Sequence, residues 1–202
     1  MTNNIHILGF AGSLRQKSYN RALLRNAQTL LPAHTTLEIF DLAAIPFFDA
    51  DVEAIGTPPS VLHFRDRMRQ ADALLIASPE YNYSITGILK NAIDWASRKG
   101  PEGQSPLDDK PVAIMGAGGR MGTVRSQMHL RDILIHNNNI VVPSPEVTIS
   151  FARQEFDEEL NLINERYRDQ IGRLLQNLAA LTHRLQMPLP TAVHTATQIA
   201  IT

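Results

Sequence analysis

The chain has 202 residues, a formal net charge of −1, 44% hydrophobic residues and no cysteine. This length suits one large domain, and the balance of apolar and charged residues supports a globular core. The net charge is close to zero, and the sequence lacks the basic stripe that a nucleic-acid-binding surface needs. Because the chain has no cysteine, it has no disulfide, thiolate nucleophile or iron–sulfur site.

Short apolar runs, which predict buried strands, alternate along the chain with longer segments of helical spacing. Pro32 ends the first helix, Ser60 is expected to cap the second, and Asn137 begins a helix terminus. An apolar stripe that starts at Leu160 marks the last helix. In chain order we expect strand 5–10, helix 20–31, strand 36–40, loop 41–59, helix 61–70, strand 73–77, helix 86–98, strand 111–115, helix 123–136, strand 140–142 and helix 157–186.

This alternation predicts an α/β fold, a parallel sheet with helices on both faces, because right-handed crossovers join its strands. Five strands favour the flavodoxin-like, doubly wound order 2-1-3-4-5, whose ligand crevice lies between the first and third strands. We expect a single domain over residues 1–190, followed by a C-terminal tail, 191–202, with some flexibility.

The loop after the first strand carries groups that bind a phosphate. Ser13 and Ser18 supply hydroxyls, Asn20 an amide, and Arg15 a guanidinium that can meet two phosphate oxygens. A following helix N-terminus adds backbone N–H groups and a favourable dipole. The Walker A and dinucleotide glycine patterns are absent. The same residues also fit an ordinary strand-to-helix loop in which Ser18 caps the helix.

The loop after the third strand suits a flat aromatic ring. Pro79 stiffens the turn, and the backbone N–H groups of Glu80, Tyr81 and Asn82 can serve the polar edge of such a ring, with Ser84 nearby. A phosphate loop and a ring loop side by side predict a flavin mononucleotide (FMN) site. Alternatively, Tyr81 is a surface turn residue and Glu80 a solvated charge.

The loop after the fourth strand is rich in glycine. Gly116, Gly118 and Gly119 let backbone N–H groups approach the ring, or they serve a tight strand-to-helix turn. Other chemistries lack support, because the chain has no His-x-x-x-His pair for a metal and no Gly-x-Ser-x-Gly elbow for a serine hydrolase. We therefore expect no metal site.

The N-terminal segment lacks the basic and apolar runs of a secretory signal. No apolar stretch approaches the roughly 20 residues that cross a bilayer. We expect a soluble cytoplasmic protein with no membrane or nucleic-acid partner.

Taken together, the loops resemble the NADPH-dependent FMN reductase family, which includes bacterial quinone, azo and chromate reductases. The resemblance is carried by Gly12–Arg15 with Ser18 and Asn20, by Pro79–Ser84 with Leu89–Trp95, by Gly118–Arg120, by Gln127–Arg131 and by Pro145–Glu146. Two positions depart from the family pattern. Thr86 stands where many relatives have proline at the start of a helix, and Met128 where many have tyrosine, which removes any polar contact that the tyrosine makes.

The resemblance implies an FMN-dependent oxidoreductase that passes hydride from NADPH or NADH through FMN to a quinone, a flavin or a similar small acceptor. By motif, Ser13, Arg15, Ser18 and Asn20 would bind the FMN phosphate, residues 79–82 with Ser84 would line the isoalloxazine, and Gly116, Gly118 and Gly119 would approach the ring. The ring does the chemistry, so no acid–base residue is assigned. The resemblance also implies a homodimer or homotetramer.

Two other functions remain open at this point. One is a flavodoxin-like electron carrier that binds FMN without oxidising NAD(P)H, although such carriers are usually strongly acidic. The other is a flavin-free binding or regulatory module on the same sheet, because fold does not fix function.

Overall fold

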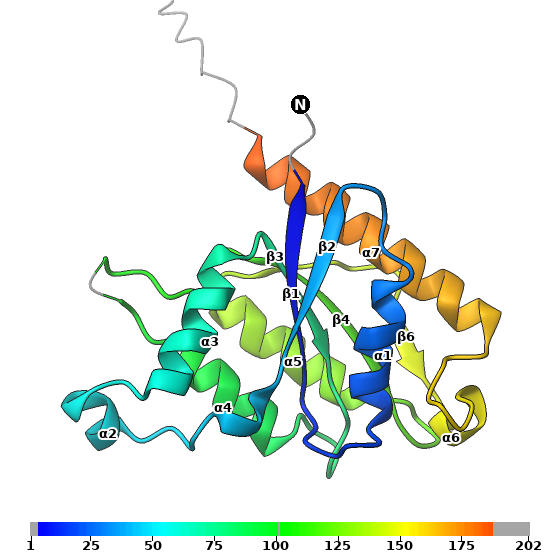
Figure 1. Ribbon diagram of the computed structural model, residues 1–202, viewed down its shortest axis with the longest axis horizontal. Helices are drawn as coiled ribbons and strands as arrows, with labels where there is room; N and C mark the ends of the chain where they lie inside the picture. Colours follow the sequence, from blue (N-terminus) through cyan, green and yellow to red (C-terminus); the bar gives the residue numbers. More distant parts are fainter. Residues whose placement is uncertain (1–3, 101, 188–202) are drawn as a thin grey trace, which may run out of the picture.

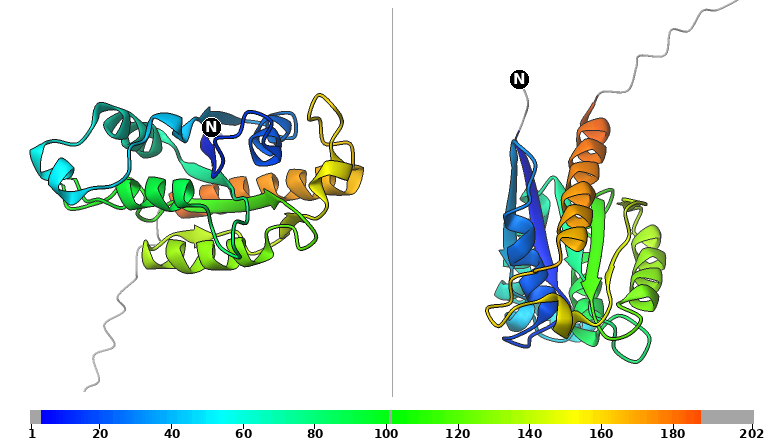
Figure 2. Two further views of the ribbon diagram at one scale, coloured as in Figure 1. Left: turned by 90° about the horizontal axis from the view of Figure 1, so that it is seen from below. Right: turned by 90° about the vertical axis from the view of Figure 1, so that its right-hand side faces the viewer.

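A parallel sheet runs through the centre of the molecule between two layers of helices (Figures 1 and 2). The computed structural model describes residues 4–100 and 102–187. The tail predicted at 191–202 lies outside these residues.

The order of the strands is the one that the sequence predicts. Neighbours in the sheet follow the sequence β2-β1-β3-β4-β5, and every pair is parallel. The strands are β1 (Ile5–Ala11), β2 (Thr35–Phe40), β3 (Ala73–Ala77), β4 (Pro111–Ala117) and β5 (Ile140–Val141). The change of direction in strand order places the crevice of a doubly wound sheet between β1 and β3.

A sixth strand, β6 (Val147–Ile149), was not predicted. Whereas β5 pairs with the beginning of β4, β6 pairs with its end, from Met115 to Ala117. The fifth position of the sheet is therefore shared by two short strands. This division matters for the site, because β6 extends the sheet at the carboxyl end of β4, where the glycine-rich loop begins.

Helices cover both faces of the sheet, as predicted. One apolar core lies under α1 and α7, and the other lies under α3, α4 and α5. Within the described residues, none of the helices has both the length and the apolar character needed to cross a bilayer. The helices are α1 (Tyr19–Gln28), α2 (Ala50–Ile55), α3 (Pro59–Gln70), α4 (Gly87–Ala96), α5 (Val124–His136), α6 (Ala152–Glu155) and α7 (Glu165–Gln186).

Four local predictions were wrong. Pro32 does not end the first helix, because α1 already ends at Gln28 with Thr29 as its C-cap. The last helix begins at Glu165, because Asn164 caps it by accepting hydrogen bonds from the backbone of the first turn, and Leu160 lies in a left-handed turn (φ 66°) before it. Ser60 does not cap α3, which starts at Pro59 without a side-chain cap. The predicted loop 41–59 contains a 3₁₀ turn at Leu42–Ala44 and the helix α2.

Candidate active site

Three loops meet at the carboxyl edge of the sheet, the lower edge in Figure 1: residues 12–18 after β1, 78–86 after β3 and 118–123 after β4. They surround a cavity of about 200 Å³, called the inner cavity below. Most of the predicted site residues line it: Ser13, Arg15, Ser18, Asn20, Pro79, Glu80, Tyr81, Gly118 and Gly119. Asn82 lines an adjoining cavity, whereas Ser84 and Gly116 line neither.

Ser18 caps α1 and also lines the inner cavity. Its Oγ accepts a hydrogen bond from the backbone N–H of Arg21 at 3.3 Å, so the proposed cap is confirmed. The N–H groups of Tyr19 and Asn20, at the start of the same helix, have no acceptor among the described residues. The cavity is thus bordered by a helix N-terminus with unpaired donors, which is a favourable place for an anion.

Asn20 holds two of the loops together. Its Nδ2 donates to the carbonyl oxygen of Ala117 at 2.8 Å, and its Oδ1 accepts from the N–H of Ala117 at 2.9 Å. The side chain is buried. Its amide therefore ties the start of α1 to the end of β4, a role that the sequence does not reveal.

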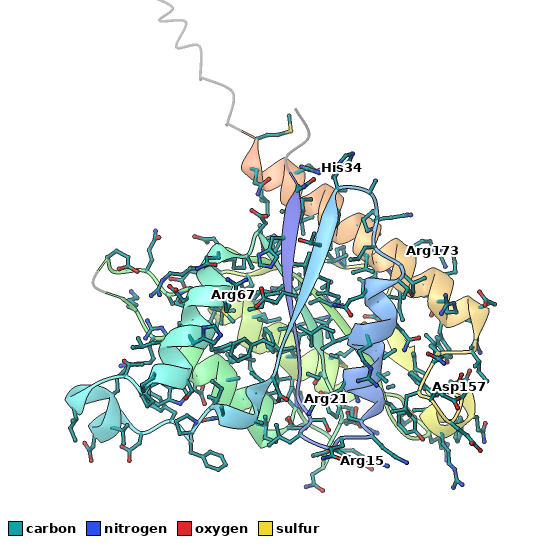
Figure 3. All side chains as sticks on the ribbon, viewed as in Figure 1. Arg15, Arg21, His34, Arg67, Asp157 and Arg173 are labelled. Atoms are coloured by element: carbon teal, nitrogen blue, oxygen red, sulfur yellow. The ribbon has the colours of Figure 1, made fainter. Side chains whose placement is uncertain are left out.

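Arg15 differs from its neighbour Arg21 in what it contacts. Arg21 forms an ion pair with Asp41 (Nη2–Oδ2 2.9 Å). Arg15 is exposed at the rim of the inner cavity and has no ion-pair partner in the part of the chain that the structure describes (Figure 3). Of these two cations, Arg15 is the one whose charge is not already offset by a carboxylate.

The ring loop contains a strained hairpin turn. Tyr81 and Ser84 exchange backbone hydrogen bonds of 3.0 and 3.1 Å, and both residues between them have positive φ, 51° at Asn82 and 64° at Tyr83. This is a type I′ turn, in which the second central position favours glycine. A tyrosine there costs of order 1–3 kcal/mol, and such strain occurs mainly at functional sites. The N–H of Tyr81, which we expected to face a ring, is used inside this turn.

Glu80 caps a helix from outside that helix. Its Oε2 accepts hydrogen bonds from the backbone N–H groups of Arg125 (2.9 Å) and Ser126 (3.2 Å), in the first turn of α5. Thr123, which precedes α5, makes no side-chain cap. The carboxylate of Glu80 is therefore not a simple solvated charge. It joins the ring loop to α5, and the positive end of the α5 dipole stabilises its negative charge.

We expect Glu80→Ala to lower the free energy of unfolding by about 0.5–2 kcal/mol, the usual cost of losing an N-terminal cap, because two backbone donors are left unpaired. Urea unfolding of the flavin-free protein would measure this. Glu80→Gln keeps an acceptor oxygen and should lose less. If the alanine variant unfolds at the same urea concentration as the parent, the capping role is wrong.

Thr86 joins the first loop to the second. Its Oγ1 donates to the carbonyl oxygen of Gly12 at 2.7 Å and accepts from the N–H of Leu89 at 3.2 Å. Thr86 therefore caps α4. A proline at this position would have neither bond, so the threonine here makes a link between loops that a proline could not make. The hydroxyl of Ser84, nearby, pairs with His129 (Oγ–Nδ1 3.0 Å).

The glycine-rich loop is held by the end of β6 and by the segment after it. Gly118 donates to Ile149 (3.0 Å), while Phe151 and Ala152 donate to the carbonyl oxygens of Gly119 and Gly118 (both 2.9 Å). A Cβ at Gly118 would lie 2.3 Å from the carbonyl oxygen of Gly122, whereas a Cβ at Gly119 would meet no atom within 4 Å. Gly118 is therefore required by the turn, and Gly119 faces open space.

Gly116 has a packing role. It is buried within β4, and a Cβ there would lie 2.1 Å from Oγ1 of Thr123 and 2.5 Å from the carbonyl oxygen of Ser78. It brings the loops after β3 and β4 close together without lining either cavity.

A larger cavity of about 860 Å³, called the outer cavity below, adjoins the inner one. The two share Glu80 and Gly119. The remaining lining residues come from the ring loop, the glycine-rich loop and the start of α5: Asn82, Tyr83, Arg120, Met121, Gly122 and Arg125. We did not predict Arg120, Met121 or Arg125 as site residues. Their sequence pattern is that of a turn and a helix start, and only the fold places them beside Tyr83.

The sequence matches the profile of the NADPH-dependent FMN reductase family over residues 5–154. It is 47% identical to an NAD(P)H-dependent FMN reductase of Pseudomonas aeruginosa over 187 residues, which are 92% of this chain and 100% of the relative. It is 41% identical to an NAD(P)H:quinone oxidoreductase of Solanum tuberosum over 188 residues, with 90% and 95% of the two chains covered.

Among solved structures, the fold is similar to that of FerB, a flavoenzyme NAD(P)H:(acceptor) oxidoreductase from Paracoccus denitrificans. The TM-score is 0.78 at 28% identity, and the match covers 89% of this chain and 98% of FerB. Sequence and fold therefore point to the same group of proteins.

Proposed function

The chain belongs to the NADPH-dependent FMN reductase family, and from this premise we propose that it is an FMN-dependent oxidoreductase that takes hydride from NAD(P)H and reduces a quinone, a flavin or a similar small acceptor. The observation that carries the proposal is the inner cavity. There a helix N-terminus, two serines and an arginine that has no ion-pair partner among the described residues lie beside the open backbone of Gly119.

The donor set fits the phosphate of FMN. Ser13 and Ser18 contribute hydroxyls, Arg15 a positive charge, and α1 the unpaired N–H groups of Tyr19 and Asn20. A phosphate dianion prefers such a combination of cation, hydroxyls and helix N-terminus. The side-chain amide of Asn20 is hydrogen-bonded to the backbone of Ala117. We therefore assign Asn20 two roles, which are to position the N-terminus of α1 and to contact the phosphate.

The other side of the inner cavity fits the isoalloxazine. Pro79 and Tyr81 offer a stiff, partly apolar wall, and the N–H groups of Glu80 and Asn82 have no acceptor among the described residues. Gly119 leaves room for a flat group, because nothing lies within 4 Å of where its Cβ would be. We infer that these residues hold the ring, with Gly118 and Gly116 shaping the loops around it.

FMN, when bound, supplies the transfer of hydride and electrons between donor and acceptor. The residues of the chain bind and orient the reactants, and we assign no acid–base residue. The outer and inner cavities have Gly119 and Glu80 in common in their linings, so donor and acceptor can reach the same place in turn. One shared access route suits an enzyme in which the first product leaves before the acceptor enters.

The proposal includes the setting of the enzyme: one FMN-binding domain over residues 1–190, working in the cytoplasm as a homodimer or homotetramer on small-molecule acceptors. The exposed apolar side chains of Met128 and Ile135 on α5 support association, because their exposed fractions are 60% and 66%.

The visible spectrum of the purified protein, before and after anaerobic addition of NADPH, tests the function. We expect a flavin spectrum that bleaches with NADPH and returns when a quinone is added. Bound FMN that NADPH does not bleach would indicate an electron carrier instead. A colourless protein that takes up no FMN would contradict the proposal altogether.

A further inference from the structure

The lining of the outer cavity has more positive than negative side chains. Its charged lining residues are Arg120, Arg125 and Glu80. Arg120 is exposed and has neither a hydrogen bond nor an ion pair within the described residues. It projects from the tip of the turn that the bond from Gly122 N–H to the Gly119 carbonyl closes (3.0 Å). The turn therefore presents this cation beside the cavity without a partner.

Arg125 lines the same cavity and is held in place by two neighbours. Its guanidinium carbon lies 3.9 Å from the ring centroid of Tyr83, a cation–π contact. Its distance to the carboxylate of Glu80 is 3.6 Å (Nη1–Oε1). The other oxygen of Glu80 already accepts two backbone hydrogen bonds. One carboxylate, largely engaged by the helix, thus faces two guanidinium groups, and the cavity has a net positive charge.

The strain at Tyr83 is consistent with this role. The residue keeps a left-handed conformation that glycine would adopt more easily, and its ring supports the guanidinium of Arg125. A guanidinium that is fixed in place loses less conformational entropy when it binds an anion. The anion cannot use the N-terminus of α5 itself, because Glu80 occupies the donors there.

We propose that Arg120 and Arg125 bind a phosphate of the nicotinamide dinucleotide, so that the outer cavity receives the phosphate-bearing part of the hydride donor. The inference rests on the proposed function. A nicotinamide at the boundary between the cavities, near Gly119, would leave the rest of the dinucleotide in the outer cavity. The phosphate could be the 2′-phosphate that only NADPH carries or the pyrophosphate common to NADPH and NADH.

Calorimetric titration of the FMN-loaded protein with 2′,5′-ADP and with 5′-ADP tests the inference without turnover. We expect the dissociation constant for 2′,5′-ADP to rise about 10-fold or more in Arg120→Gln and in Arg125→Gln, since each loses a charged hydrogen bond. Arg120→Lys should recover part of the affinity. Arg166→Gln, an equal loss of charge at an exposed position of α7, is the matched control and should change it little.

A loss confined to 2′,5′-ADP assigns the arginines to the 2′-phosphate and predicts a lower ratio of NADPH to NADH activity. An equal loss for both ligands assigns them to the 5′-phosphate that both ligands carry, which is part of the pyrophosphate in the dinucleotide. Unchanged affinity for both ligands in the double variant overturns the inference. Bleaching of the parent flavin by NADH or NADPH is recorded on the same samples. Its absence defeats the proposed function, whereas bleaching with unchanged affinities defeats only the arginine assignment.

Discussion

Gly118→Ala is expected to destabilise the protein by about 1–3 kcal/mol and to remove tight FMN binding. The added Cβ would lie 2.3 Å from the carbonyl oxygen of Gly122, which is backbone and cannot move without opening the turn. Opening it would also disturb the bonds of Gly118 to Ile149 and Ala152. Urea unfolding of the flavin-free protein and a fluorescence titration with FMN would measure the two effects.

Gly119→Ala is the matched comparison, because the same methyl group there meets no protein atom within 4 Å. We expect it to unfold like the parent and yet to bind FMN more weakly, since the methyl group would occupy space that the ring requires. If both variants bind FMN like the parent, the glycine-rich loop does not border the flavin.

Arg15→Ala is expected to weaken FMN binding by about 1.5–3 kcal/mol, roughly 10- to 150-fold in the dissociation constant, because a charged hydrogen bond to the phosphate is lost. Arg15 is exposed and without an ion-pair partner in the described part of the chain, so its removal should hardly affect stability. The effect should be much smaller for riboflavin, which has the same ring and no phosphate.

Lys17→Ala is the control for Arg15→Ala, because it removes the same charge from the same loop at a residue that lines neither cavity. We expect less than a few-fold change there, mostly from long-range charge. Equal effects of the two substitutions would show that general charge, and not contact with the phosphate, governs the affinity.

Much of the fold could be predicted because the strands are short apolar runs at regular intervals. Ala73–Ala77 is buried along its whole length, and such a run has few other interpretations. The strand Val147–Ile149 could not be found in this way, because three residues give no period and its pairing is with the distant carboxyl end of β4. The start of the last helix was misplaced because Leu160 continues the apolar spacing although Asn164 begins the helix.

The site was partly predictable for a similar reason. Ser13, Arg15 and Ser18 follow a strand at the position where this fold binds ligands, so residue type and place in the chain suffice. The contacts of Asn20 with Ala117 and of Glu80 with the start of α5 join residues 97 and 45 positions apart, respectively. Such partners are set by packing of the whole domain, and no local pattern in the sequence encodes them.

Three side chains, those of Asn20, Thr86 and Glu80, each reach from one segment of the rim to the backbone of another. The arrangement of the rim is consequently settled when the chain folds, before any ligand arrives. Because the rim is already ordered, binding a ligand costs less conformational entropy than it would if the rim were mobile. A pre-arranged entrance of this kind lets chemically different ligands bind in turn at one site without a conformational change of the protein between them.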